Sequence, residues 1–189
     1  MCSGVDADMD KLAGNMPGSE KRERNRKKGT VSFAVWLVAA AVLTAADQLT
    51  KQLAVSGLGG SRTIRLLPGA LEFVLVENRG AAFGLGQGGK WLFVALAALI
   101  SVFLLYDLWK GSRAEAGALR GIGETMVVAG AVGNALDRVR LGYVIDFIYV
   151  KLIDFPVFNV ADICVTAGCA LIVLSLLTER GASGTPERS

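Results

Sequence analysis

Four long apolar segments alternate with polar stretches along this chain of 189 residues. Each is close to the roughly 20 residues that a helix needs to cross the hydrocarbon core of a bilayer. We therefore expect four transmembrane helices, at about residues 31–53, 91–109, 121–139 and 160–178. The pattern predicts an all-α membrane protein.

The polar ends of the chain frame one membrane domain. We expect this domain to cover residues 31–178, with a disordered basic tail at 1–30 and a short polar tail at 179–189. Six lysines and arginines lie between residues 21 and 28, directly before the first apolar segment. Under the positive-inside rule, this run holds the N-terminus in the cytoplasm. Four crossings return the C-terminus to the same side.

Residues 54–90 and 140–159 are then expected on the outer side of the membrane. In the first of these regions, the run IRLLPGALEFVLV at 64–76 alternates loosely between apolar and polar positions. Pro68 and Gly69 interrupt it with a turn signal. The pattern predicts a small strand pair that turns at these two residues.

Composition excludes several kinds of chemistry. The chain has no histidine, so it has no Ser-His dyad and no histidine-ligated zinc. Its three cysteines are too few and too scattered for a disulfide framework or a metal cluster. A net charge of only +3 argues against a nucleic-acid partner. We expect no metal and no cofactor, and acid–base chemistry must fall to carboxylates, lysine, tyrosine or cysteine.

Charged and amide side chains lie near the outward ends of the apolar segments. Asp47 and Lys51 are four residues apart in the first segment, so they share one helical face. Asn134, Asp137 and Arg138 share a face of the third segment. An ionisable residue in a membrane span is costly and by default marks a functional site. The structural alternatives are a self-contained ion pair for the first set and interhelical hydrogen bonding for the second.

Two further aspartates lie at the same expected depth. Asp146 interrupts the apolar run YVIDFI, and Asp162 follows the start of the fourth segment. Two close carboxyls can hydrolyse an amide without histidine, because the ionised one takes a proton from water while the protonated one donates. A small proton-coupled transporter would use the same ingredients, and an assembly factor could use them only to hold helices together. Spacing alone leaves these alternatives open.

Five short motifs resemble those of the bacterial lipoprotein signal peptidases. They occur in the family's order: DQLTK at 47–51, NRGAAF at 78–83, GNALDR at 133–138, VIDF at 144–147 and FNVAD at 158–162. The resemblance covers about residues 31–178. It implies four transmembrane helices with a small extracytoplasmic β-cradle. It also implies an aspartyl endopeptidase that removes the signal peptide from diacylglyceryl-modified prolipoproteins, cutting before the lipidated cysteine.

The motifs also indicate the site. By this resemblance the catalytic residues would be Asp146 and Asp162. The supporting or substrate-binding residues would be Asp47, Lys51, Asn78, Gly80, Asn134, Asp137, Arg138 and Asn159. The expected partners are prolipoprotein substrates and membrane lipid, with the protein acting as a monomer. The expected location is the bacterial cytoplasmic membrane, with both termini in the cytoplasm and the active site toward the outer face.

Overall fold

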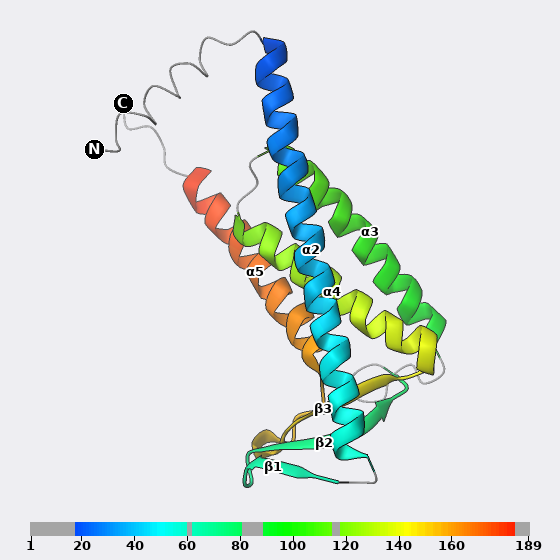
Figure 1. The fold of residues 1–189 in the computed structure, drawn as a ribbon. Coiled ribbons are helices and arrows are strands. Elements are labelled where there is room, and N and C mark those ends of the chain that lie inside the picture. Colours follow the sequence, from blue (N-terminus) through cyan, green and yellow to red (C-terminus); the bar gives the residue numbers. More distant parts are fainter. Residues whose placement is uncertain (1–17, 60–61, 81–88, 115–117, 184–189) are drawn as a thin grey trace, which may run out of the picture.

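The computed structural model describes residues 18–59, 62–80, 89–114 and 118–183. Within these ranges, long helices form a bundle and a small antiparallel sheet lies across one end of it (Figure 1). The helices are α2 (Gly18–Leu58), α3 (Lys90–Ala114), α4 (Ala118–Leu141) and α5 (Val160–Ser183). The predicted helical class is therefore confirmed.

Three of these helices contain a segment long and apolar enough to cross a membrane. The segments are Phe33–Leu58 in α2, Lys90–Gly111 in α3 and Val160–Thr178 in α5. Helix α4 does not reach that hydropathy, because charged residues such as Glu124, Asp137 and Arg138 interrupt it. It contacts all three other helices and is buried along much of its length. A helix covered by protein on several sides does not need an apolar surface all round.

Helix α2 begins earlier than the sequence pattern suggested. We expected the first helix to start near residue 31, whereas the helical backbone starts at Gly18. The basic run at residues 21–28 therefore lies within the helix. Lysine, arginine and glutamate are good helix formers, which allows the helix to extend beyond its apolar part. The rest of the expected N-terminal tail, residues 1–17, and the chain end at 184–189 lie outside the described residues.

Helices α4 and α5 approach each other closely. A Cβ atom on Gly130 of α4 would lie 2.3 Å from the carbonyl oxygen of Ala161, which is too close for any side chain. The glycine therefore allows the first turn of α5 to pack directly on the backbone of α4. This contact fixes the start of α5, where Asp162 lies, against the middle of α4.

The sheet has three strands in the order β1-β2-β3, all antiparallel. Strands β1 (Ile64–Leu67) and β2 (Leu71–Asn78) form the predicted pair, and Gly69 in their turn has a φ of 76°. Strand β3 (Val144–Val150) was not predicted; its run VIDFIYV was read only as part of an outer loop. Because residues on both of its faces are buried or half-buried, it lacks the apolar–polar alternation that identifies a strand.

A small apolar cluster joins the sheet to the bundle. Ala54 and Leu58 of α2 pack against Phe147 of β3, with Phe73 beside them. The rings of Phe73 and Phe147 meet edge to face with centroids 5.9 Å apart. This cluster fixes the end of α2 to the sheet. The neighbouring residues of α2, α4 and β3 can therefore meet at the junction of bundle and sheet.

Candidate active site

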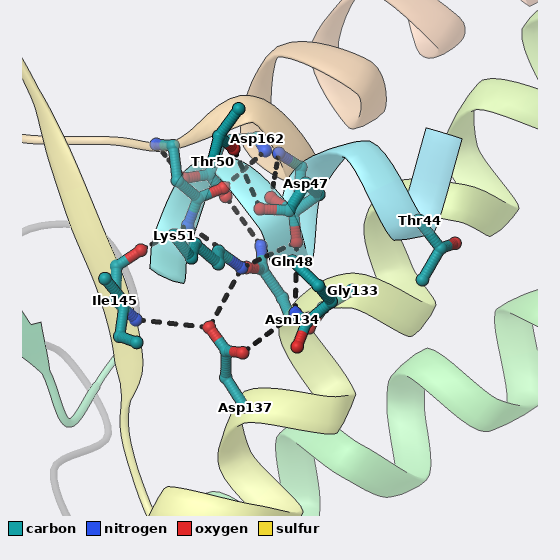
Figure 2. A network of polar contacts seen from close by, with 12 residues as sticks. Thr44, Asp47, Gln48, Thr50, Lys51, Gly133, Asn134, Asp137, Ile145 and Asp162 are labelled. Carbon is teal, nitrogen blue, oxygen red and sulfur yellow. Dashed lines mark hydrogen bonds and ion pairs between the residues drawn. The ribbon is translucent and has the colours of Figure 1, made fainter. Parts of the chain in front are cut away.

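A buried ion-pair cluster lies where α2 meets α4. The Lys51 ammonium is 2.9 Å from Oδ2 of Asp47 and 2.9 Å from Oδ2 of Asp137 (Figure 2). The side chains of Asp47 and Lys51 are only 1% exposed. Breaking a buried ion pair by removing one partner is strongly destabilising, because it leaves uncompensated charge in a low dielectric. This cluster is therefore a structural base that holds α2 against α4.

The same carboxylates tie two other elements, α5 and β3, to this base. Asp47 Oδ1 accepts a hydrogen bond from the backbone N–H of Ala161, the second residue of α5, at 2.9 Å. Asp137 accepts one from the Ile145 N–H of β3 at 3.2 Å, and another from Gln48 Nε2 at 2.9 Å. A Cβ on Gly133 would lie 2.6 Å from Asp47 Oδ2, so no side chain fits there. Gln48 is a site residue that the sequence prediction missed, although it lies inside the motif DQLTK.

The first turn of α5 fixes the Asp162 carboxylate. Asp162 Oδ2 accepts the backbone N–H of Asn159 at 3.0 Å, and Asn159 Oδ1 accepts the backbone N–H of Asp162 at 3.0 Å. This reciprocal arrangement is a capping box. The remaining oxygen, Oδ1, accepts Nδ2 of Asn134 at 2.8 Å. The N-terminus of a helix favours negative charge, so this position suits a carboxylate.

Asp146 lies on β3 and is 1% exposed. Its Oδ1 accepts Nδ2 of Asn159 at 2.6 Å, and its Oδ2 accepts Nδ2 of Asn78 at 2.8 Å. Burial raises the pKa of Asp146 to about 6, the nearby charge of Asp162 adds to the increase, and the two amide hydrogen bonds oppose it. The Asn159 side chain thus bridges the Asp146 carboxylate and the backbone N–H of Asp162, and so holds β3 beside the first turn of α5.

Arg138 connects α4 to the chain that follows β2. Its Nη2 donates to the carbonyl oxygen of Gly80 at 3.1 Å, and its Nη1 lies 3.4 Å from the carbonyl oxygen of Asn134. The guanidinium lies over the ring of Phe93, 4.8 Å from its centroid. Phe93 of α3 was not predicted as a site residue, because one aromatic residue in an apolar helix gives no signal of such a contact. Ala81, Ala82 and Phe83 of the expected motif lie outside the described residues.

All ten predicted site residues belong to one continuous network. Lys51 links the ion pairs to Asn134 by a hydrogen bond of 2.9 Å, and Asn134 accepts Nδ2 of Asn159 at 3.1 Å. Gly80 joins the network because its N–H donates to Asn78 Oδ1 at 3.0 Å. Glu124 and Asp154 lie outside this network: Glu124 pairs with Arg120, and Asp154 accepts the Tyr149 hydroxyl. Within the described ranges, no group of three or more acidic or cysteine side chains is placed to hold a metal.

Comparison with known families decides the class of protein. The family model for signal peptidase (SPase) II matches residues 39–178. The chain belongs to the signal peptidase II family. It is 42% identical over 147 residues to the lipoprotein signal peptidase of Symbiobacterium thermophilum, covering 76% of this chain and 95% of the relative. It is 35% identical over 144 residues to the lipoprotein signal peptidase of Lactococcus lactis subsp. lactis, covering 76% of this chain and 94% of the relative.

A solved structure agrees with this membership. A bacterial membrane enzyme determined by the in meso method at 2.3 Å resolution superposes with a TM-score of 0.72 and 29% sequence identity. The match covers 82% of this chain and 94% of the enzyme. Together with the three apolar helices, this likeness identifies a membrane protein of the signal peptidase II family. The comparisons favour the peptidase interpretation over the transporter that the spacing alone had left open.

Proposed function

We propose that this signal peptidase II family member is an aspartyl endopeptidase that removes signal peptides from diacylglyceryl-modified prolipoproteins. It cuts before the lipidated cysteine. One observation carries the aspartyl assignment: Asn159 donates its side-chain amide to the Asp146 carboxylate and its backbone N–H to the Asp162 carboxylate, and both carboxylates are otherwise held by asparagine amides. The relatives named lipoprotein signal peptidase support the substrate class.

The two aspartates take different roles in this proposal. Asp146 carries the shared proton, because burial has raised its pKa to about 6. Asp162 is the base, because it lies at the N-terminus of α5, which favours negative charge. Asp162 removes a proton from water while the water oxygen attacks the scissile carbonyl carbon. Asp146 donates its proton to the carbonyl oxygen.

The second half of the reaction reverses the direction of proton transfer. As the tetrahedral intermediate collapses, the carbonyl re-forms and the C–N bond breaks. The protonated Asp162 gives its proton to the leaving amine of the lipidated cysteine, and Asp146 recovers its proton from the hydroxyl. The pair thus returns to its starting state with one proton, as two close carboxyls require.

The other network residues divide by what they contact. Asn78 and Asn159 orient the Asp146 carboxyl through their side-chain amides. Arg138 and Gly80 lie where a substrate backbone would enter, since Gly80 presents no side chain and Arg138 retains N–H donors. The cluster of Lys51 with its two carboxylates holds α2, α4, β3 and α5 in register beneath the reacting pair.

Topology completes the proposal. Helix α4, the third of the four helices in chain order, also spans the membrane. It does so packed against α2, α3 and α5. The basic run at residues 21–28 places both termini in the cytoplasm of a bacterial cell, so the sheet and the site lie at the outer face of the membrane. The membrane domain covers residues 31–178, and one copy of the chain suffices for catalysis. A substrate that keeps its diacylglyceryl group in the outer leaflet reaches the site by lateral diffusion.

Cleavage of a diacylglyceryl-modified prolipoprotein by the purified protein in detergent tests this function. The wild type should release the signal peptide, whereas Asp146→Asn and Asp162→Asn should each lose about a thousandfold or more of the turnover. Asp154→Asn is the matched control, because this exposed acid accepts the Tyr149 hydroxyl and lies outside the network of the ten predicted site residues. Equal cleavage by all variants would exclude the aspartate pair, and an inactive wild type would exclude the peptidase function.

A further inference from the structure

The sheet ends in an exposed apolar corner, which begins where β3 ends, four residues along the strand from Asp146 and roughly 13 Å at the rise of a strand. We define the sheet tip as residues 65–70, which end β1 and form the β1–β2 turn, together with residues 151–155, which include the short 3₁₀ helix η2 (Lys151–Ile153) after β3. A backbone hydrogen bond from Leu152 N–H to Ala70 O at 3.3 Å joins the two parts. The tip exposes large apolar side chains: Leu66 at 47%, Leu67 at 59%, Leu152 at 73%, Ile153 at 67% and Phe155 at 48%. A cluster of this kind indicates an interaction surface.

Strand register separates this surface from the site. Leu71 pairs with Val150 at the tip, whereas Asn78 pairs with Val144 at the other end of the same strands. At about 3.3 Å per residue, the length of β2 places these ends roughly 20 Å apart. The sheet tip therefore lies outside the network that holds Asp146. Its apolar side chains are not explained by contact with the scissile bond.

Two cations and two carboxylates lie at the tip. Lys151 Nζ lies 3.0 Å from Oε1 of the buried Glu72, and Arg65 Nε lies 3.8 Å from the same oxygen. The one carboxylate thus faces two cations, and the Arg65 side chain is 71% exposed. The other carboxylate, Asp154, accepts the Tyr149 hydroxyl at 2.6 Å. Apolar side chains beside an exposed arginine are typical of segments that lie in a membrane interface with anionic lipid.

We propose that the sheet tip is a membrane anchor: Leu67, Leu152 and Ile153 enter the boundary between headgroups and acyl chains, and Arg65 binds lipid phosphate. The position in the fold favours lipid over a second copy of the chain. Figure 1 shows the tip at one corner of the sheet, beside the end of the bundle where α5 begins. Phe155 is only a few residues before Val160, where the apolar surface of α5 starts.

The anchor has a consequence for the proposed reaction. Strand β3 carries Asp146 and continues directly into η2. A tip held at a fixed depth therefore holds β3, and with it the Asp146 carboxyl, at the depth where a lipidated substrate presents its scissile bond. This inference rests on the membrane embedding in the proposed function. It adds to that function a surface that fixes the depth of the sheet relative to the membrane.

Tryptophan quenching in vesicles tests the anchor without relying on activity. Ile153→Trp is reconstituted into phosphatidylcholine–phosphatidylglycerol vesicles whose acyl chains carry bromine, and the signal of the parent protein is subtracted. The added tryptophan should emit at short wavelength and be quenched by bromine. Glu77→Trp, at an exposed position near the opposite end of β2, is the matched control and should be quenched less. Emission typical of water with no quenching would overturn the anchor, as would a signal that depends on protein density instead of bromine.

Activity gives a second test. The double variant Leu152→Ser, Ile153→Ser should cleave as the wild type does in detergent but severalfold more slowly in vesicles, because only a bilayer fixes the height of the sheet. Equal rates in vesicles would contradict the functional consequence. If the wild type itself were inactive in both media, the proposed function would fail, while the quenching result would still decide whether the tip lies in lipid.

Discussion

The two ends of the helix bundle both bury carboxylates, but they hold them in different ways. At the end away from the sheet, Arg120 pairs with Glu124 at 2.8 Å and also with Asp107. At the sheet end, Lys51 pairs with Asp47 and Asp137 in the same manner. Each of these carboxylates is matched to a cation.

Asp146 and Asp162 differ from all of them. In the part of the chain that the structure describes, neither forms an ion pair, and their oxygens accept N–H groups of asparagines or backbone. Protonating a carboxylate that shares the buried Lys51 ammonium would leave part of that cation's charge unpaired, which is costly. A carboxylate held by neutral amides can gain or lose a proton without that penalty. The comparison therefore separates the Lys51 cluster, which builds the frame, from the aspartate pair, which is held by amide groups and carries no such penalty.

The largest expected effect is on the frame. Lys51→Met removes the cation from between two buried carboxylates and should lower the free energy of unfolding by about 3–5 kcal/mol. Lys110→Met is the matched control, because Lys110 is exposed and lies over the Tyr106 ring; it should change stability by less than about 0.5 kcal/mol. Thermal or denaturant unfolding in detergent measures both. Equal stability of the two variants would show that the Lys51 cluster is not a structural base.

The next effect is on pH dependence. The pKa of Asp146 is raised to about 6, so the folded protein binds this proton more tightly than the unfolded chain does. The stability contribution of this group is therefore greatest at low pH and is lost as the pH rises through the folded pKa. Turnover should fall in the same direction, by about tenfold for each pH unit above that value, because the acid is deprotonated. A rate that stays constant or rises from about pH 6 to pH 8 would contradict Asp146 as the proton donor.

A smaller effect is expected at Phe93. Replacing it with leucine removes the ring beneath the Arg138 guanidinium, an interaction of about 0.5–2 kcal/mol. Turnover should fall by up to about tenfold with little change in the unfolding temperature, and Phe93→Trp should restore it because tryptophan keeps an aromatic face. Steady-state kinetics on the three proteins checks this. In an Arg138→Ala background, Phe93→Leu should cause no further loss of turnover. A loss as large as in the wild type would contradict the prediction, because Phe93 would then not act through Arg138.

The smallest effect is expected at the end of the bundle away from the sheet. Glu124→Gln keeps an oxygen for the Arg120 Nε–H but removes its charge, and Arg120 retains Asp107 as a partner. We expect a loss of about 1 kcal/mol in unfolding free energy and no change in turnover. The same unfolding and cleavage assays measure it. A large loss of turnover with the fold intact would show that the two ends are coupled.

Sequence patterns predicted much of the helical fold and the hairpin, because apolar length and turn residues are local properties. The convergence of ten residues on one network was also expected, from motif resemblance more than from spacing. The roles of Asp146 and Asp162 in catalysis stay predictions.

The missed features depend on tertiary packing. Strand β3 was hidden because its apolar run does not alternate, and it becomes a strand through pairing with β2. Gln48 gave no electrostatic signal, and its role depends on reaching Asp137 across the helix interface. Phe93 is one aromatic residue among many apolar ones in α3, and only the fold places it beneath Arg138.

The most direct measurement is infrared spectroscopy of the carboxyl groups across the pH range around 6. A protonated buried carboxyl has a C=O stretch distinct from that of a carboxylate. The spectrum of the wild type minus that of Asp146→Asn should show this band at low pH and lose it as the pH rises through the apparent pKa. The same difference should persist when both proteins also carry Glu124→Gln, which removes the buried carboxyl at the far end of the bundle. A difference spectrum without the band would contradict the claim that these two aspartates share the reacting proton.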